Sequence, residues 1–263
     1  MLLATRKQIL QYLFVDAQGQ FYAIYNGLRV SSVFQPIFDK HLNVVGVEAL
    51  ARIHTLTGEC MMPDTIFLGE ETNTEDKINL ECLSRVVHIR NYSLSTYRNV
   101  ALFINMLPAA SERYAYTDIE CTLLAKRLKE LQIDASNIVM EIIEAKSESD
   151  DLLQNALQRM HEYGFNIAID DYGVEESNEY RLNLLNPQIV KLDRSLMQDY
   201  VNGTQSPLLN ALTTIRNKGA KIVVEGIETE AQFNAMRGLN VDMLQGYYLA
   251  EPQAIVQGLQ HVG

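Results

Sequence analysis

Short apolar runs rich in β-branched residues recur along the chain, and segments with helical periodicity separate most of them. Runs of this length and composition predict strands, whereas apolar residues three and four positions apart predict helices that bury one face. Strands that alternate with helices pair in parallel. The eight predicted strands are Ser32–Phe38, Val44–Ala49, Val100–Asn105, Ile138–Ile142, Ile167–Asp170, Ile189–Leu192, Ile222–Val224 and Val241–Leu244.

The predicted helices are supported by two apolar stripes and one capping pattern. Thr229 followed three residues later by Gln232 is typical of a capping box that opens a helix. Residues 74–98 and 206–218 are helical by length and composition. The stripes comprise Ile119, Leu123, Leu124, Leu128 and Leu131 in one helix, and Leu152, Leu153, Ala156, Leu157 and Met160 in the next.

Eight strand and helix units predict an α/β protein, a (β/α)8 barrel of the TIM type. Only Asp39 to Asn43 separate the first two strands, which is too short for a parallel crossover. We therefore expect an antiparallel first strand, whose N-terminal part shares a rim with the C-terminal ends of the others. Residues 1–30 are predicted to be a lead-in segment, and residues 31–263 the barrel domain.

Composition and charge narrow the classes of function. The chain has 263 residues, 47% of them hydrophobic, and a formal net charge of -11 without any run of Lys or Arg. Binding along a nucleic-acid polymer needs a basic face, so that class is excluded. No apolar run is long enough to insert in a membrane, and no signal peptide is recognisable. Three scattered cysteines without metal-ligand spacing favour a reduced, cytoplasmic setting.

Polar residues stand at every predicted strand end that faces the rim of the barrel. In this fold the active site lies at the C-terminal rim and takes residues from several strands. A polar residue at any single strand end has a structural explanation, but eight of eight favour a site. These residues are Gln35, Glu48, Asn105, Glu141, Asp170 with Asp171, Lys191, Glu225 and Gln245.

The pair Asp170-Asp171 ends an apolar strand directly before Tyr172-Gly173. Neighbouring side chains of a strand point to opposite faces, yet both carboxylates can converge where the backbone turns. Asp is also a common strand terminator and helix N-cap, so the pair alone leaves a structural interpretation open.

Five converging carboxylates would repel one another. Each like-charge pair at 4 Å costs about 4 kcal/mol at an effective dielectric constant near 20, and Lys191 alone cannot neutralise them. Oxygen ligands without Cys or His favour a hard ion such as Mg²⁺ or Mn²⁺. Two adjacent Asp residues suit a pair of ions, which predicts metal-assisted hydrolysis of a phosphoester.

Seven ordered motifs resemble the EAL domain family of cyclic di-GMP phosphodiesterases over about residues 31–253. The first is Glu48-Ala49-Leu50, preceded by Gln35-Pro36-Ile37 and followed by Arg52. The others are Asn105 with Pro108, Glu141-Ile142-Ile143-Glu144, Asp170-Asp171-Tyr172-Gly173, Lys191-Leu192-Asp193-Arg194, Glu225-Gly226-Ile227-Glu228 and Gln245-Gly246-Tyr247-Tyr248.

The resemblance implies a role for each matching residue. Glu48, Asn105, Glu141 and Asp170 would bind the first of two Mg²⁺ or Mn²⁺ ions, with Asp170 bridging and Asp171 serving the second. Glu225 would be the general base or a ligand of the second ion, and Lys191 would orient the attacking water or a phosphate oxygen. The resemblance implies that the catalytic residues are Glu48, Lys191 and Glu225. Gln35, Arg52 and Gln245 would bind substrate, and Glu144 and Glu228 would support the loop after Asp171.

Two departures from the family pattern concern that loop. Active members usually continue the Asp pair with Phe-Gly-Thr-Gly-Tyr-Ser, whereas this chain reads Tyr172, Gly173, Val174, Glu175, Glu176 and Ser177. Ile143 also replaces the threonine of the Glu-x-Thr-Glu motif.

The resemblance therefore implies one of two functions for a stand-alone, single-domain member. The first is metal-dependent hydrolysis of cyclic di-GMP to linear pGpG, with low activity if the loop is limiting. The alternative is a receptor of cyclic di-GMP, or a regulator that contacts a protein partner, without turnover. The family also implies a homodimer.

Overall fold

Eight strands close into a barrel in the computed structural model, which describes residues 2–116, 119–143, 149–173 and 178–255. The barrel strands are β3 (Leu28–Asp39), β4 (Val44–Thr55), β6 (Ala101–Met106), β7 (Ile138–Ile142), β8 (Asn166–Tyr172), β9 (Ile189–Leu192), β10 (Lys221–Val224) and β11 (Met243–Leu244). Neighbours pair in parallel from β4 to β11, whereas β3 pairs antiparallel with both β4 and β11. The predicted barrel with an antiparallel first strand is confirmed.

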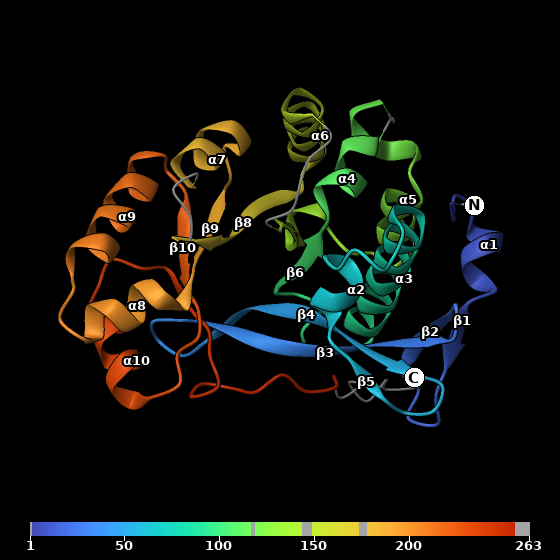
Figure 1. Cartoon of the computed structure of the whole chain (residues 1–263), viewed down its shortest axis with the longest axis horizontal. Coiled ribbons are helices and arrows are strands. Elements are labelled where there is room, and N and C mark those ends of the chain that lie inside the picture. The colour runs from blue at the N-terminus through green and yellow to red at the C-terminus, as the bar shows by residue number, and fades with distance from the viewer. Residues whose placement is uncertain (1, 117–118, 144–148, 174–177, 256–263) are drawn as a thin grey trace.

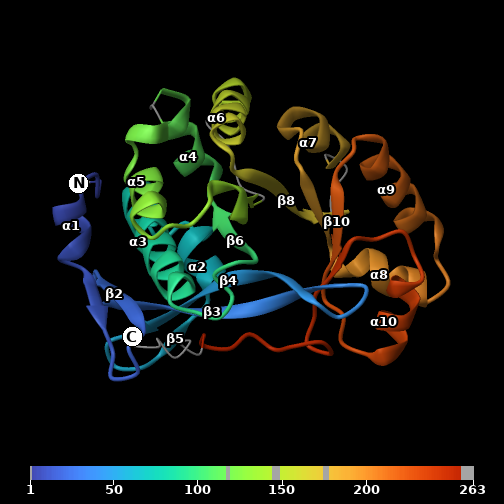
Figure 2. The ribbon, with the colours of Figure 1, turned by 180° about the vertical axis from the view of Figure 1, so that it is seen from behind.

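Helices surround the barrel on its outside (Figures 1 and 2). The longer ones are α3 (Thr74–Ser93), α5 (Leu123–Glu130), α6 (Asp150–Tyr163), α7 (Asn178–Leu185), α8 (Arg194–Val201), α9 (Ser206–Asn217) and α10 (Glu230–Arg237). The shorter ones are α1 (Arg6–Leu10), α2 (Pro63–Phe67), α4 (Pro108–Ser111) and the 3-10 turns Glu112–Tyr116, Ile119–Cys121 and Ala135–Asn137. The predicted capping box opens α10, where the Thr229 side chain accepts from the backbone of Gln232.

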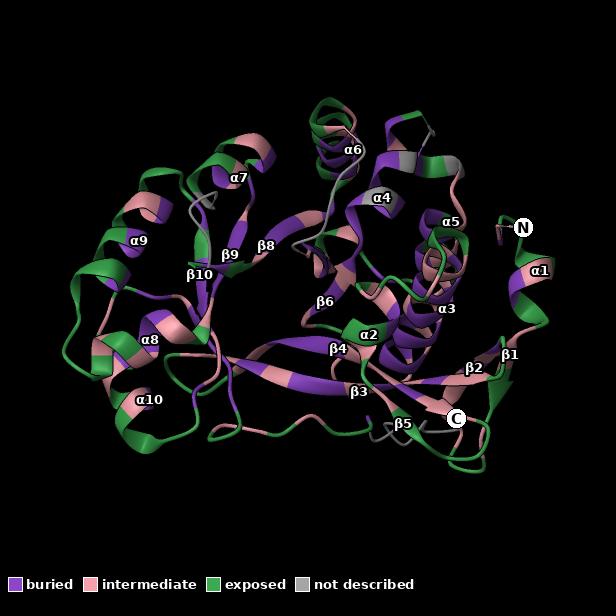
Figure 3. Cartoon of the chain, viewed as in Figure 1, coloured by how far each residue is buried: buried purple, intermediate pink, exposed green. Residues whose placement is uncertain are grey.

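The main core lies between the strands and the helices, and buried residues dominate the inner faces of both (Figure 3). A second apolar cluster fills the barrel itself. It comprises Ile37, Phe103, Val139, Ala168, Ile189, Val223 and Met243, one from each of seven strands. On β4 the corresponding position is Gly46, where a Cβ would lie 2.8 Å from the Phe103 ring. The interior is therefore packed, so a ligand can reach the barrel only at a rim.

The N-terminal residues extend the sheet beyond the barrel. Strand β2 (Phe21–Tyr25) pairs antiparallel with β3, and β1 (Leu13–Val15) pairs with β2. On the other side, β5 (Cys60–Met61) pairs with β4. The proposed boundary at residue 30 falls inside β3, because the β3–β4 ladder continues to Leu28 and Thr55.

A separate core cluster holds this extension together. Leu3, Ile9, Ala23 and Tyr25 pack in it with buried residues of α3, which are Leu80, Leu83 and Val87. No helix in the described part of the chain is long and apolar enough to cross a bilayer.

Candidate active site

On seven of the barrel strands, the site residue lies two positions from the apolar residue that fills the barrel interior. Side chains two positions apart share a face of a strand, so the residue two positions after a filling residue points to the same interior. Asn105, Glu141, Asp170, Lys191, Glu225 and Gln245 follow the filling residues Phe103, Val139, Ala168, Ile189, Val223 and Met243 in this way. Gln35 precedes Ile37 because β3 runs in the opposite direction. Because side chains alternate between the two faces of each strand, the predicted polar residues lie together in one ring at the rim of the barrel.

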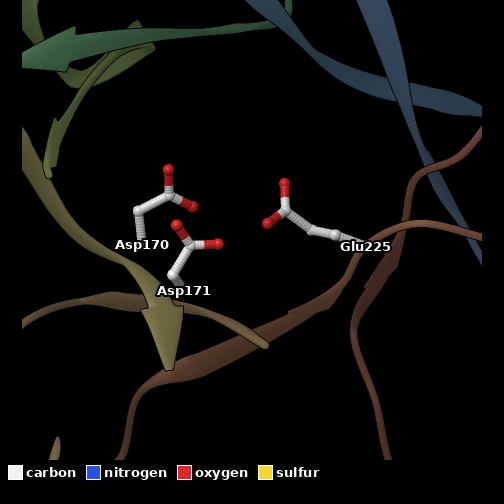
Figure 4. Close-up of side chains that lie close together, drawn as sticks. All are labelled: Asp170, Asp171 and Glu225. Carbon is white, nitrogen blue, oxygen red and sulfur yellow. The ribbon is translucent and has the colours of Figure 1, made fainter. Parts of the chain in front are cut away.

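A β-bulge brings both aspartates of β8 to this ring. The ladder with β9 pairs Ile169 with Val190 but Tyr172 with Leu192, so β8 contains one extra residue at Asp170-Asp171. Asp171 has a left-handed backbone with φ 55°, and such bulges re-aim side chains beside active sites. Asp170, Asp171 and Glu225 each place a carboxylate oxygen within 4.8 Å of the others, and Figure 4 shows the three groups facing one another.

Lys191 lies at the centre of the carboxylates. Its Nζ is 2.8 Å from Glu141 Oε1 and 2.8 Å from Glu225 Oε1. Asp170 Oδ1 lies 3.0 Å from the same nitrogen, and Glu48 Oε2 lies 3.5 Å from it. The lysine side chain is only 1% exposed. One ammonium group thus contacts four carboxylates and leaves an excess of negative charge.

Amides link the remaining ring residues to Glu48. Gln245 Nε2 donates to Glu48 Oε2 at 2.7 Å and lies 3.2 Å from Gln35 Oε1. Asn105 Nδ2 lies 3.5 Å from Glu48 Oε1. Gln35 in turn donates to the carbonyl of Ala250 at 3.2 Å. The carboxylate of Glu48 is therefore held between two amides and Lys191.

Burial and neighbouring charges shift the pKa values of three residues in the ring. It raises the pKa of Glu141 well above its ordinary value of 4.5, against the opposing effect of Lys191. Burial also raises the pKa of Glu225, with Asp170 and Glu48 adding to the effect. For Lys191, burial alone would lower the pKa, but the four carboxylates outweigh it and raise the pKa well above 10.5. The fold concentrates negative charge where water is largely excluded.

The donor set fits hard divalent cations. Every candidate ligand is a carboxylate or amide oxygen, which Mg²⁺ and Mn²⁺ prefer. Glu141 Oε2 is buried without a hydrogen-bond partner among the described residues. Such an orphaned acceptor is costly unless a cation or donor approaches it.

An open cleft of about 280 Å³ lies in front of the ring. Gln35, Glu48, Glu225 and Gln245 line it. Arg194 and Tyr247 also line it, although the sequence analysis gave neither of them a role. Their positions shortly after strand ends could have indicated this. Arg194 is the first residue of α8, directly after the N-cap Asp193, and Tyr247 lies two residues after Gln245.

Two predicted residues, Arg52 and Glu228, are not brought into the ring. Arg52 lies four positions past Glu48 on β4 and donates to the carbonyl of Ala51. Glu228 lies at the edge of the cleft, where its carboxylate is 3.9 Å from Arg194. Glu144 and the segment Val174–Ser177 lie outside the described residues, so the proposed support of that loop stays a prediction.

Gly226 offers a test of how the turn after Glu225 is built. Its φ is +68°, and a Cβ there would lie 2.6 Å from Arg194 Cβ. We expect Gly226→Ala to lower the free energy of unfolding in urea by about 1–3 kcal/mol more than Gly219→Ala. Gly219 is the matched control, because its φ of +77° is similar but no atom lies within 4 Å of the added Cβ. Equal losses in the two variants would show that the contact with Arg194 is unimportant.

Comparisons with known proteins agree with this architecture. A family model described as "EAL domain" matches residues 22–252. The chain is 30% identical over 155 residues, 54% of its length, to the Escherichia coli K12 protein named "Probable cyclic di-GMP phosphodiesterase PdeA". It spans 21% of PdeA and at most 41% of seven further curated relatives.

Two solved structures share the fold at meaningful sequence identity. The first is a standalone versatile EAL protein from Vibrio cholerae O395 bound to c-di-GMP. It is 28% identical with a TM-score of 0.71, over 85% of this chain and 92% of that chain. The second is Bacillus subtilis YkuI in complex with c-di-GMP and calcium, 25% identical with a TM-score of 0.71, over 86% of this chain and 55% of that one. With a match over residues 22–252 and the same barrel, the chain belongs to the EAL domain family.

Proposed function

We propose that this chain hydrolyses cyclic di-GMP to linear pGpG with two divalent cations, Mg²⁺ or Mn²⁺. The observation that supports this proposal most strongly is the convergence of four carboxylates on Lys191 at the open rim of the barrel, with Asp171 as a fifth beside Asp170 and Glu225. Cyclic di-GMP carries two phosphodiesters, which such a ring would repel without added positive charge. YkuI, which shares the fold, binds this nucleotide together with calcium.

The ring divides into two sets of ligands. Glu48, Asn105, Glu141 and Asp170 would hold one ion, and Asp170, Asp171 and Glu225 would hold the other. When bound, two such ions activate water and stabilise both oxygens of an in-line displacement at phosphorus.

The chain's own groups would assist the reaction in three ways. The ammonium group of Lys191 orients the attacking water or a phosphate oxygen from its fixed, buried position. The Glu225 carboxylate, which lies 2.8 Å from Lys191 Nζ, would accept the proton of that water. Arg194 offers a cation to a phosphate in the cleft. Water oxygen bonds to phosphorus, the P–O3′ bond breaks, and the 3′ oxygen takes a proton.

The decisive test is turnover by the purified chain. Cyclic di-GMP is incubated with the protein in Mg²⁺, in Mn²⁺ and in EDTA, and linear pGpG is measured by chromatography. We expect product with either ion and none in EDTA. Nucleotide binding without product in any of the three buffers would refute the proposal and favour a receptor.

The raised carboxyl pKa values predict how pH affects the metal-free fold. Glu141 and Glu225 bind protons more tightly in the folded than in the unfolded chain, because burial raises their pKa. Their contribution to stability is therefore complete below about pH 4.5 and is lost as pH rises through the raised values. In EDTA we expect the Tm to fall as pH rises above about 4.5, and we expect Mn²⁺ to reduce that fall. The same slope in both buffers would argue against a cation at these carboxylates.

The segment after Gly173 favours the second candidate function, a protein that binds the nucleotide or a partner without turnover. Its sequence, Val174-Glu175-Glu176, replaces the Thr-Gly-Tyr of the family pattern. If this segment limits catalysis, restoring Thr-Gly-Tyr should raise kcat several-fold, since small displacements of catalytic groups are costly. Unchanged kcat, measured in the same chromatographic assay, would remove the segment as the limit on activity.

A further inference from the structure

A second and larger cavity lies away from the catalytic ring. It is a groove of about 650 Å³ whose floor is α3 and whose walls are α1 and α5, at the end of the molecule that holds the N-terminus (Figures 1 and 2). The α3 residues that line it are Ile78, Cys82, Arg85, Val86, Ile89 and Arg90. They recur at helical spacing over about 18 Å of the helix, at 1.5 Å per residue. The described part of the chain therefore does not fully cover this face of α3.

The charge of the groove is opposite to that of the protein. Its lining contains five cations, Arg6, Arg85, Arg90, Lys126 and Arg127, and one carboxylate, Glu130, although the whole chain carries a net charge of -11. Glu130 pairs with both Arg6 and Arg127, at 3.2 Å and 2.8 Å. Arg85 pairs with Glu81 at 2.8 Å. A local reversal of charge in an acidic protein indicates a surface that selects an anionic partner.

Arg90 lacks the carboxylate that its neighbours have. None of the described carboxylates forms an ion pair with it, and its Nε is buried without a hydrogen-bond partner. Its guanidinium lies 4.8 Å from the centre of the Phe21 ring. Burial and then the nearby Arg127 and Arg6 lower the pKa of Arg90. An acidic group in the groove would supply the missing acceptor.

We propose that this groove binds an acidic amphipathic helix of a partner protein. The apolar floor would take the apolar face of the helix, as in other complexes that seat a helix in a groove. Glutamates or aspartates along its edges would pair with Arg90 and Lys126. A helix fits better than a compact anion because the floor follows α3 for more than three turns, and two helices wall it.

Binding can be tested with a synthetic helical peptide of about four turns. The peptide carries leucine at i, i+3, i+4 and i+7 positions and glutamate elsewhere, and a second peptide replaces every glutamate by lysine. We expect the purified full chain to bind the glutamate peptide in calorimetry, and to bind it more weakly as salt increases. The lysine peptide should not bind.

Variants assign the binding to the groove. Arg90→Gln should weaken binding of the glutamate peptide by about tenfold, as expected for loss of a charge-assisted contact. Lys126→Glu changes an exposed residue of the same groove, so it tests the surface even if Arg90→Gln unfolds. Lys221→Gln, an exposed lysine outside the groove, is the matched control and should bind like the unaltered chain.

Several results would overturn the proposal. These are no binding of the glutamate peptide at about 1 mM, equal binding of both peptides, or equal binding by the Lys126→Glu and Lys221→Gln variants. Palmitate that binds through Arg90 while the peptide does not would assign the groove to a lipid-like anion instead. A dimer in sedimentation that dissociates in the Lys126→Glu variant would assign it to a second copy of this chain.

Discussion

Replacing Asp170 by alanine should lower the turnover of cyclic di-GMP by at least about a thousandfold. Asp170 contacts Lys191 at 3.0 Å and faces Asp171 and Glu225, so it belongs to both proposed ligand sets. Its removal would deprive both ions of a ligand at once, and loss of a single preorganised hydrogen-bond donor at a reacting centre already costs about two to three orders of magnitude in kcat in other enzymes. The measurement is kcat for pGpG formation in saturating Mn²⁺.

The variant needs a control for nonspecific effects of losing a carboxylate. Asp199 is suitable because it is an exposed aspartate of α8 outside the cleft. Asp199→Ala should keep the kcat of the unaltered chain. An equal kcat for Asp170→Ala and Asp199→Ala would contradict the assignment of Asp170 to the metal site.

The barrel could be predicted because its strand periodicity is unambiguous. The predicted runs Ile138–Ile142 and Ile189–Leu192 match β7 and β9 residue for residue. The five-residue gap from Asp39 to Asn43 was sufficient to predict the direction of β3, because a parallel crossover does not fit in it. The helix predicted for 74–98 ends earlier, at Ser93, since length and composition do not mark where a helix stops.

The N-terminal segment was harder to place. Its short aromatic runs form β1 and β2, but the strand that they join depends on contacts far along the chain. Phe21, for example, binds the side chain of Asn91 through both its N–H and its carbonyl. Strand β2 pairs with the part of β3 that extends past the barrel in the long β3–β4 hairpin.

The ring of polar residues could be predicted from their places at the strand ends, but its internal contacts could not. The sequence places Asp170 and Asp171 on opposite faces of a regular strand, and only the bulge against β9 brings both to the mouth. Nor does the order of residues indicate that Lys191 touches four carboxylates, or that Arg194 lines the cleft. These contacts depend on side-chain reach across strands that are distant in the chain.

The lysine at the centre of the ring should be essential to the fold as well as to catalysis when no cation is present. Lys191→Met keeps the length and the apolar stem of the side chain but removes the only ammonium group that contacts Glu141, Glu225, Asp170 and Glu48 among the described residues. Breaking a buried ion pair from one side costs about 3–5 kcal/mol, because the remaining charge stays buried without compensation. We expect a loss of that size in the free energy of unfolding in EDTA near neutral pH, measured with urea.

Cations and pH separate this electrostatic effect from a packing defect. Lower pH protonates Glu141 and Glu225, whose pKa values burial already raises, so the deficit of Lys191→Met should shrink as pH falls. Mn²⁺ should reduce the deficit for the same reason, whereas turnover should stay low because no group then orients the water. Lys221→Met, on the exposed start of the neighbouring strand β10, should show neither change. If the loss in the free energy of unfolding of Lys191→Met changed with neither pH nor Mn²⁺, Lys191 would act by filling space. The charge balance proposed for this ring would then be wrong.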